Sequence, residues 1–127
     1  MSNASAMSVT GTRVGACLVV TLGRDLGAGA LDAVRQVLLD GVQRGGAASV
    51  ILDCSGVPFM DSHEFGELRK VLRMAELLGA RCVLVGLQPG IIVHLMAVDA
   101  DVRGLQAMLG LDEALQALGG SGGTLHA

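Results

Sequence analysis

Residues 48–86 read "ASVILDCSGVPFMDSHEFGELRKVLRMAELLGARCVLVG", and this stretch decides the fold. The apolar run at 48–55, closed by Asp53, is typical of a central parallel strand that is covered on both faces. A helical pattern follows over 61–80, and a second short apolar run occupies 81–86. A strand, a helix and a strand in this order predict neighbouring parallel strands in one sheet.

The rest of the chain continues the alternation. We expect further strands at 8–13, 16–22 and near 102–108, and further helices at 26–46, 88–98 and 111–118. Pro89 stands where a first helical turn tolerates proline. The order β-β-α-β-α-β-α-β-α predicts a single α/β domain. Its sheet has four to five strands, is mixed but mostly parallel, and carries about four helices, with the first hairpin adding an antiparallel edge.

Two of the expected helices have a clear apolar face. In the helix at 26–46, the apolar residues at helical spacing are Leu31, Val34, Leu38 and Val42. In the helix at 61–80, they are Phe65, Leu68, Leu72 and Ala75, and Leu78 extends the face. Glycines at 45–46 and at 79 end these helices in the usual way. Both faces are predicted to pack on the sheet.

Composition excludes several classes of function. The chain has 127 residues, is 51% hydrophobic and has a net charge of -3, which suits one domain with a real core. It has no basic stripe and no Tyr or Trp for stacking on bases, so we expect no nucleic-acid partner. Its apolar runs are shorter than the roughly 20 residues of a membrane span, so we expect no membrane partner.

The two ends are set apart from this domain. "SNA" at residues 2–4 is typical of a cloning scar, and we interpret residues 1–6 as the remnant of an expression tag, with Met7 as the native start. The domain is expected over 7–118. The Gly/Ser-rich residues 119–127 are expected to form a flexible tail.

The chain shows no pattern for a metal or another cofactor. Cys17, Cys54 and Cys82 lie far apart, without the spacing of metal ligands, and we expect buried, reduced thiols in a cytoplasmic protein. The "GAGALD" at 27–32 resembles a dinucleotide fingerprint, but Asp32 replaces its last glycine and would repel a pyrophosphate. We therefore expect no cofactor.

Ser62 allows three interpretations. As the nucleophile of a small hydrolase it has a poor setting, because the side chain of its neighbour His63 would diverge from it and no GxSxG motif occurs. As a cap it is not needed, because Asp61 and Glu64 have the spacing of a capping box. Ser62 is then the first helical residue, exposed near free N–H groups and the positive end of the helix dipole, which is a good place for a phosphate.

The same residues resemble the STAS domain of anti-sigma-factor antagonists, and most closely the small stressosome subunits. The resemblance covers about residues 9 to 118. It rests on "ILDCSGVPFMDS" at 51–62, "LLGARCVLVGLQP" at 77–89 and "RGLQAMLGLDEALQAL" at 103–118. It implies a small α/β fold with a mixed sheet, which agrees with the order of elements above.

The resemblance also implies a function. Members of this family are not enzymes, and a partner serine/threonine kinase phosphorylates a Ser or Thr at the start of the second helix, which by position is Ser62 here. The chain would then be a scaffold that sequesters a switch kinase, releases it on phosphorylation of Ser62 and assembles with related STAS proteins. The expected partner-binding residues are Asp53, Asp61, Ser62, His63, Glu64 and Phe65. Asp53 has a second interpretation, as an acid that organises its loop by accepting backbone N–H bonds.

Alternatives within and outside this class stay open. The chain could be a direct anti-sigma-factor antagonist, or a STAS domain that binds a small ligand or serves in a lipid-transport complex. Direct antagonists often carry Gly two residues after the serine, where this chain has Glu64, and this departure favours the stressosome type. His94 replaces a frequent Thr, and the stretch at 98–104 lacks a glycine common in the family, so the helix at 88–98 is expected to end differently.

Overall fold

A five-stranded sheet forms the centre of the computed structural model, which describes residues 9–98, 107–108 and 110–120. Its strands are β1 (Val9–Val14), β2 (Cys17–Leu22), β3 (Ser49–Asp53), β4 (Arg81–Val85) and β5 (Ala107–Met108), and they lie side by side in chain order. β1 and β2 are antiparallel, and every later neighbour is parallel. The predicted mixed, mostly parallel sheet with an antiparallel hairpin at its edge is confirmed.

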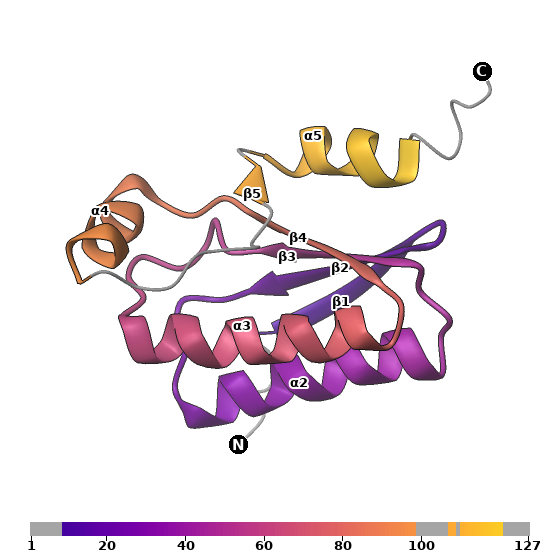
Figure 1. Ribbon diagram of the computed structural model, residues 1–127, viewed down its shortest axis with the longest axis horizontal. Helices are drawn as coiled ribbons and strands as arrows, with labels where there is room; N and C mark the ends of the chain where they lie inside the picture. The colour runs from indigo at the N-terminus through magenta and orange to yellow at the C-terminus, as the bar shows by residue number, and fades with distance from the viewer. Residues whose placement is uncertain (1–8, 99–106, 109, 121–127) are drawn as a thin grey trace.

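Helices cover both faces of this sheet. They are α2 (Ala28–Gln43), α3 (Ser62–Leu77), α4 (Pro89–Ala97) and α5 (Leu111–Leu115), and α5 continues into a π-helical turn, η1 (Gln116–Gly120). Figure 1 shows α2 and α3 side by side on one face, α5 on the other face and α4 at one end of the molecule. Together with the strands, these helices confirm the predicted α/β order of elements.

The sheet is apolar on both faces because its strands alternate between two cores. In β3, Val50 and Leu52 face α2 and α3, while Ile51 faces α5. The larger core also receives Ile91 and Leu95 from α4. The smaller core is closed by Ala114 of α5 and by Leu118. Burial on both sides explains why the inner strands read as unbroken apolar runs.

The helix faces match the sequence pattern except at one residue. Val34, Leu38 and Val42 of α2 are buried, as are Phe65, Leu68, Leu72 and Ala75 of α3. The expected extension of the α3 face to Leu78 is wrong, because this side chain is 46% exposed. Leu78 is the C-cap of α3, where the chain already leaves the helix towards Gly79, whose φ is +103°. Helical spacing therefore no longer places the side chain of Leu78 on the buried face of α3.

The parallel strands bring the important loops to one end of the sheet. The carboxyl ends of parallel strands lie at the same edge, and Asp53 at the end of β3 is the register partner of Val85 at the end of β4. The loop that leads to Ser62 and the loop that leads to Pro89 therefore start side by side.

Several expectations fall on residues that the structure does not describe. Residues 1–6, the first part of the strand expected near 102–108, and residues 121–127 lie outside the described ranges. Of the expected tail, Gly119 and Gly120 belong to η1. The expected difference at the end of α4 concerns residues 98–104, of which only Val98 is described.

Candidate functional site

Ser62 is the first residue of α3, and its two acidic neighbours form the helix cap. Asp61 is the N-cap, and its Oδ1 accepts a hydrogen bond from the backbone N–H of Glu64 at 2.8 Å. Oε1 of Glu64 accepts from the backbone N–H of Asp61 at 3.0 Å. The predicted capping box is confirmed. Ser62 is exposed, and neither of these bonds uses its hydroxyl.

The loop before Ser62 is held by Asp53 and by the end of β4. Oδ1 of Asp53 accepts from the backbone N–H of Ser55 at 3.0 Å and from its hydroxyl at 2.7 Å, which confirms Asp53 as a loop-organising acid. The N–H of Cys54 donates to the carbonyl of Val85 at 2.8 Å. Nε2 of Gln88 donates to the carbonyl of Ser55 at 3.3 Å. These bonds tie the start of the loop to the neighbouring strand.

The structure brings most of the expected partner-binding residues to the surface. Ser62 and His63 are exposed, whereas Asp53, Asp61 and Glu64 are partly exposed. Phe65 is different, because it is 2% exposed and belongs to the core beneath α3. The expectation that Phe65 contacts a partner is therefore corrected: its side chain anchors the first turn of α3 and cannot reach a partner in this conformation.

A groove of about 650 Å³ lies between the beginnings of α2 and α3. Its lining residues are Leu26, Gly27, Gly29, Leu31, Asp32, Arg35, His63, Glu64 and Glu67. Two leucines supply apolar surface, and the polar lining contains three carboxylates, one arginine and one histidine. This balance of charge disfavours a phosphate-bearing ligand. A cationic or polar side chain of a partner would fit it better.

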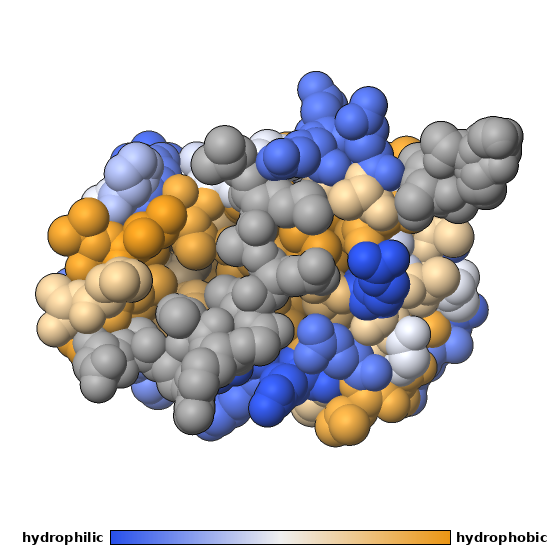
Figure 2. Space-filling model, turned by 45° about the horizontal axis from the view of Figure 1, so that its top comes forward, coloured by the Kyte–Doolittle hydropathy of each residue, from blue (hydrophilic) through white to orange (hydrophobic). Residues whose placement is uncertain are grey.

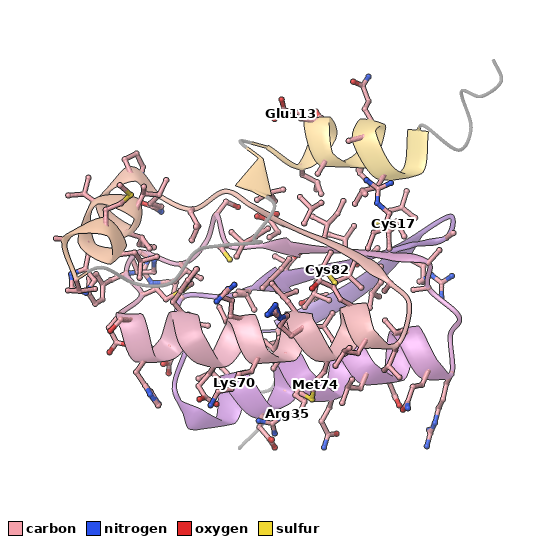
Figure 3. The ribbon with its side chains drawn as sticks, in the orientation of Figure 1. Cys17, Arg35, Lys70, Met74, Cys82 and Glu113 are labelled. Atoms are coloured by element: carbon pink, nitrogen blue, oxygen red, sulfur yellow. The ribbon has the colours of Figure 1, made fainter. Side chains whose placement is uncertain are left out.

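Ion pairs order the charged side chains of this groove. Nη1 of Arg35 lies 2.6 Å from Oδ1 of Asp32, and Nζ of Lys70 lies 3.1 Å from Oε2 of Glu67. Figure 3 shows Arg35 and Lys70 coming from the two adjacent helices. The hydrogen bond and the charge of Lys70 lower the pKa of the Glu67 carboxyl, with smaller effects from His63 and Arg35. The carboxylate of Glu67 is therefore charged at neutral pH.

An apolar surface lies at the end of the molecule formed by α4. We call it the α4 patch, and it comprises Phe59, Ile92, Val93, Met96 and Val98, all of them exposed. Figure 2 shows hydrophobic residues gathered at this end. The ring of Phe59 lies 5.2 Å from the ring of His94, centroid to centroid, at an angle of 57°. Phe59 precedes Ser62 by three residues, and three residues of chain span at most about 11 Å. The Cα atoms of Phe59 and Ser62 therefore lie within about 11 Å of each other.

Sequence reasoning missed both the groove and the α4 patch as parts of the site. The groove needs α2 and α3 to lie side by side, which no short motif reports. The α4 patch did leave a signal. The stretch "PGIIVHLMA" contains no Asp, Glu, Lys or Arg and, apart from its histidine, is apolar on all sides, and such a helix is normally buried.

The described geometry adds no support to the interpretation of the chain as a hydrolase or as a metal-binding protein. His94 packs on Phe59, His63 follows Ser62 on the helix, and His126 lies outside the described residues. Cys17, Cys54 and Cys82 are buried and free. Burial raises the pKa of the Cys54 and Cys82 thiols to about 12, so they stay protonated and unreactive at neutral pH. Within the described ranges, no cluster of three or more His, Cys, Asp or Glu could hold a metal ion.

The model of one protein family, described as the STAS domain, matches residues 5–117. The chain belongs to the STAS domain family. A search of curated proteins gave no match. In the described part of this STAS domain, no helix combines the length and the apolar character needed to cross a membrane.

Solved structures agree with the family. This STAS domain is similar to a serine-to-glutamate variant of RsbS from Moorella thermoacetica, with 25% identity and a TM-score of 0.75 over 90% of this chain and 97% of that chain. It is similar to a chain in a structure of the stressosome, a signal integration and transduction hub, with 26% identity and a TM-score of 0.75 over 89% and 98% of the two chains.

The anti-sigma factor antagonist SpoIIAA has the same fold. Its unphosphorylated form has 20% identity and a TM-score of 0.68 over 88% of this chain and 98% of that chain. The phosphorylated form, from Bacillus, has 20% identity and a TM-score of 0.66 over 87% and 98%. This STAS domain therefore has an RsbS-type fold.

Proposed function

We propose that this STAS domain is a non-enzymatic regulatory module of the stressosome type. It holds a serine/threonine switch kinase in the cytoplasm and releases this kinase when the kinase phosphorylates Ser62. The observation that carries the proposal is the position of Ser62: it is exposed at the first turn of α3, while Asp61 and Glu64 supply the cap. A kinase can therefore reach the hydroxyl without breaking the bonds that start the helix.

The neighbours among solved structures support this proposal. The RsbS variant carries glutamate in place of a serine, and SpoIIAA exists in an unphosphorylated and a phosphorylated form. The stressosome is described as a hub for signal integration. The identity with RsbS and with the stressosome chain is 25–26%, against 20% for SpoIIAA, and this favours a scaffold over a direct anti-sigma-factor antagonist.

Charge explains how phosphorylation would release a partner. A phosphoserine adds about -1.5 to -2 charges at neutral pH. The start of α3 stabilises this anion by about 0.3–1 kcal/mol, and the carboxylates of Asp61 and Glu64 oppose it. The fold tolerates the change because Ser62 is exposed. A partner packed over Ser62 does not, since burying an unpaired dianion is costly.

The surface around Ser62 suggests how the kinase binds. The α4 patch offers apolar contact on the side of Phe59, and the groove between α2 and α3 offers carboxylates on the side of His63. We expect the kinase to bring an apolar surface to the first and a basic or polar side chain to the second. Such a footprint covers Ser62 and links binding to its phosphorylation.

Phosphorylation in solution tests the proposal. The protein is incubated with ATP and the serine/threonine kinase encoded near it, and mass spectrometry locates the phosphate. We expect one phosphate, on Ser62, and loss of the complex on gel filtration after the reaction. Ser62→Ala is the control: it should bind the kinase, stay unmodified and remain bound. Phosphate on another residue, or none, would overturn the assignment of Ser62.

The same binding assay separates the two family roles. A complex with an anti-sigma factor, and none with the kinase except as its substrate, would make the chain a direct antagonist. Ser62→Asp is a weak mimic of the phosphate, so enzymatic phosphorylation decides the result. Melting temperatures of all variants should stay close to that of the parent protein, because substitutions at exposed positions change stability by less than about 0.5 kcal/mol.

A further inference from the structure

We propose that His94 is a positioning residue, which holds the ring of Phe59 in the direction in which the kinase meets it. This inference rests on the proposed function, because it names a side chain through which the kinase is oriented on Ser62. Phe59 lies in the loop before Ser62, and His94 lies in the last turn of α4. The centroids of the two rings are 5.2 Å apart, and the ring planes meet at 57°. Tilted arrangements of this kind are favourable for aromatic pairs.

The backbone on either side of Phe59 is fixed, whereas its side chain faces the solvent. Val57 and Met60 are fully buried and anchor the loop in the main core. Pro58 restricts the backbone further, since its ring locks φ. The side chain of Phe59 is nevertheless 54% exposed. The loop therefore places Phe59 at the surface, and the direction of its ring depends on what the ring packs against.

Helix α4 supports His94 from below. Ile91 and Leu95 of this helix are buried in the main core, and His94 itself is partly buried. The N–H of Val98 donates to the carbonyl of His94 at 3.1 Å and closes the last turn. An exposed side chain without such a neighbour changes rotamer within nanoseconds. The contact with His94 therefore orders a ring that would otherwise move freely.

An ordered aromatic ring beside the phosphorylation site is a good anchor for a partner. Aromatic side chains are frequent among the residues that carry most of the binding energy of an interface. A partner that meets an ordered ring also loses less entropy than one that must order it. Phe59 precedes Ser62 by three residues, so a kinase that covers Ser62 also meets this ring.

This arrangement makes a specific prediction about a double variant. If His94 acts through Phe59, removing the ring of Phe59 also removes the effect of His94. Two side chains that contact the kinase independently would instead give effects that add. The combined variant therefore separates a positioning role of His94 from direct contact with the kinase.

Isothermal titration of the full chain with the kinase measures these effects in the Ser62→Ala background, where no phosphate is transferred. We expect His94→Ala to raise the dissociation constant about two- to tenfold, as for the loss of an aromatic pair. Phe59→Ala should raise it at least as much, and Phe59→Ala/His94→Ala should equal Phe59→Ala alone. His94→Phe keeps a ring and should bind like the parent protein. Leu77→Ala, which truncates an exposed side chain at the far end of α3, is the control and should change nothing.

The kinetics of Ser62 phosphorylation add a measurement that a merely structural role would not separate. His94→Ala should raise KM and leave kcat unchanged, because the ring of Phe59 contributes to binding and not to phosphoryl transfer. A lower kcat with an unchanged KM would overturn the inference.

Fluorine NMR tests the positioning without the kinase. Phe59 and Phe65 are the two phenylalanines of the chain, so labelling with 4-fluorophenylalanine gives two signals. Phe65 is buried and serves as the internal reference. His94→Ala should move the Phe59 signal towards the value of the free amino acid and leave the Phe65 signal in place. Adding the kinase to the parent protein should shift the Phe59 signal.

These outcomes distinguish the inference from the proposed function. Additive effects of Phe59→Ala and His94→Ala would show that His94 contacts the kinase itself. An unchanged Phe59 signal in His94→Ala would show that other contacts hold the ring. Either result overturns the inference and leaves phosphorylation of Ser62 intact. If the kinase does not bind the parent protein, the proposed function fails, while the fluorine signals still decide whether His94 orders Phe59.

Discussion

Asp61 and Glu64 each accept a hydrogen bond from the backbone of the other. The N–H of Glu64 donates to Asp61 at 2.8 Å, and the N–H of Asp61 donates to Glu64 at 3.0 Å. This reciprocal pair starts α3 and satisfies two N–H groups that a helix end otherwise leaves open. Ser62 lies between them and is not needed for the cap. The first turn of the helix can therefore carry a modification without losing its start.

Replacing the cap residue should lower stability without touching Ser62. We expect Asp61→Ala to reduce the free energy of unfolding by about 0.5–2 kcal/mol, because the N–H of Glu64 loses its acceptor. Asp61→Ser should keep most of the stability, since serine is also a good N-cap. Urea denaturation of both variants measures the difference. An equal loss in the two variants would mean that the cap bond is not the cause.

Replacing two glycines by alanine should change the stability of the protein in opposite directions. Gly86 has a φ of +77°, and a Cβ there would lie 2.8 Å from Cβ of Ser55 and 2.9 Å from its nitrogen. Gly86→Ala should therefore cost at least about 1–2 kcal/mol from the backbone conformation alone. Gly66 lies inside α3 with nothing within 4 Å of an added Cβ, so Gly66→Ala should gain about 0.5–1 kcal/mol.

Thermal unfolding of the two variants checks this prediction. Hydrogen exchange adds a local measurement, because the crowding at Gly86 pushes on the loop that Asp53 and Ser55 form. Residues 54–60 should exchange faster in Gly86→Ala and at the parent rate in Gly66→Ala. Unchanged stability of Gly86→Ala would contradict the close contact with Ser55, and a loss of stability in Gly66→Ala would contradict the open space at Gly66.

The α4 patch should affect partner binding more than it affects stability. Met96 is 70% exposed in the last turn of α4, where a cation interacts well with the helix dipole. We expect Met96→Lys to fold normally and to weaken binding of the switch kinase about tenfold or more, because a charge enters an apolar contact. The control is Leu77→Lys at the far end of α3, where the side chain is 86% exposed.

Isothermal titration with the unphosphorylated protein measures both affinities. Leu77→Lys should bind like the parent protein, since it lies one helix length from Ser62. Equal weakening by the two lysines would indicate a general effect of charge. Unchanged binding of Met96→Lys would remove the α4 patch from the kinase footprint and leave the role of Ser62 open.

Alkaline pH should destabilise the fold through its buried thiols. Burial raises the pKa of Cys54 and Cys82 from 9.0 to about 12. Between these values the unfolded chain releases thiol protons that the folded chain keeps, so the free energy of unfolding falls as pH rises above 9. The stabilising contribution is complete below the unfolded pKa and is lost as pH rises towards 12.

Urea unfolding across this pH range measures the slope, and a double variant isolates its cause. Cys54→Ala/Cys82→Ala should lose stability at neutral pH because it removes buried atoms. It should also show a shallower decline above pH 9 than the parent protein. The same slope in both proteins would assign the decline to other groups. Thiol reagents should label these cysteines in the parent protein only when it opens.

Features that depend on neighbouring residues in the chain could be predicted. The capping box and the loop bonds of Asp53 join groups within a few residues of each other, so spacing is sufficient to infer them. The start of α4 follows from the position of its proline. The buried faces of α2 and α3 followed from helical period alone. Leu78 shows where this reasoning stops, because the period continues in the sequence after the helix itself has ended.

Contacts between distant segments could not be predicted in the same way. Gln88 reaches Ser55 across 33 residues of chain, and Arg13 reaches Gly45 across 32. Phe59 reaches His94 across a similar distance in the chain. Each contact depends on how strands and helices pack, and no local pattern encodes the distance between two elements.

The sequence by itself determined the α/β order, the helix start at Asp61 and an accessible Ser62 beside it. These properties follow from local hydrogen bonding and from apolar periodicity, which residue identity controls directly. Only the tertiary structure decided what surrounds Ser62. It buried Phe65, brought Phe59 against α4 and opened the groove between α2 and α3, because packing of the whole core determines which side chains remain at the surface.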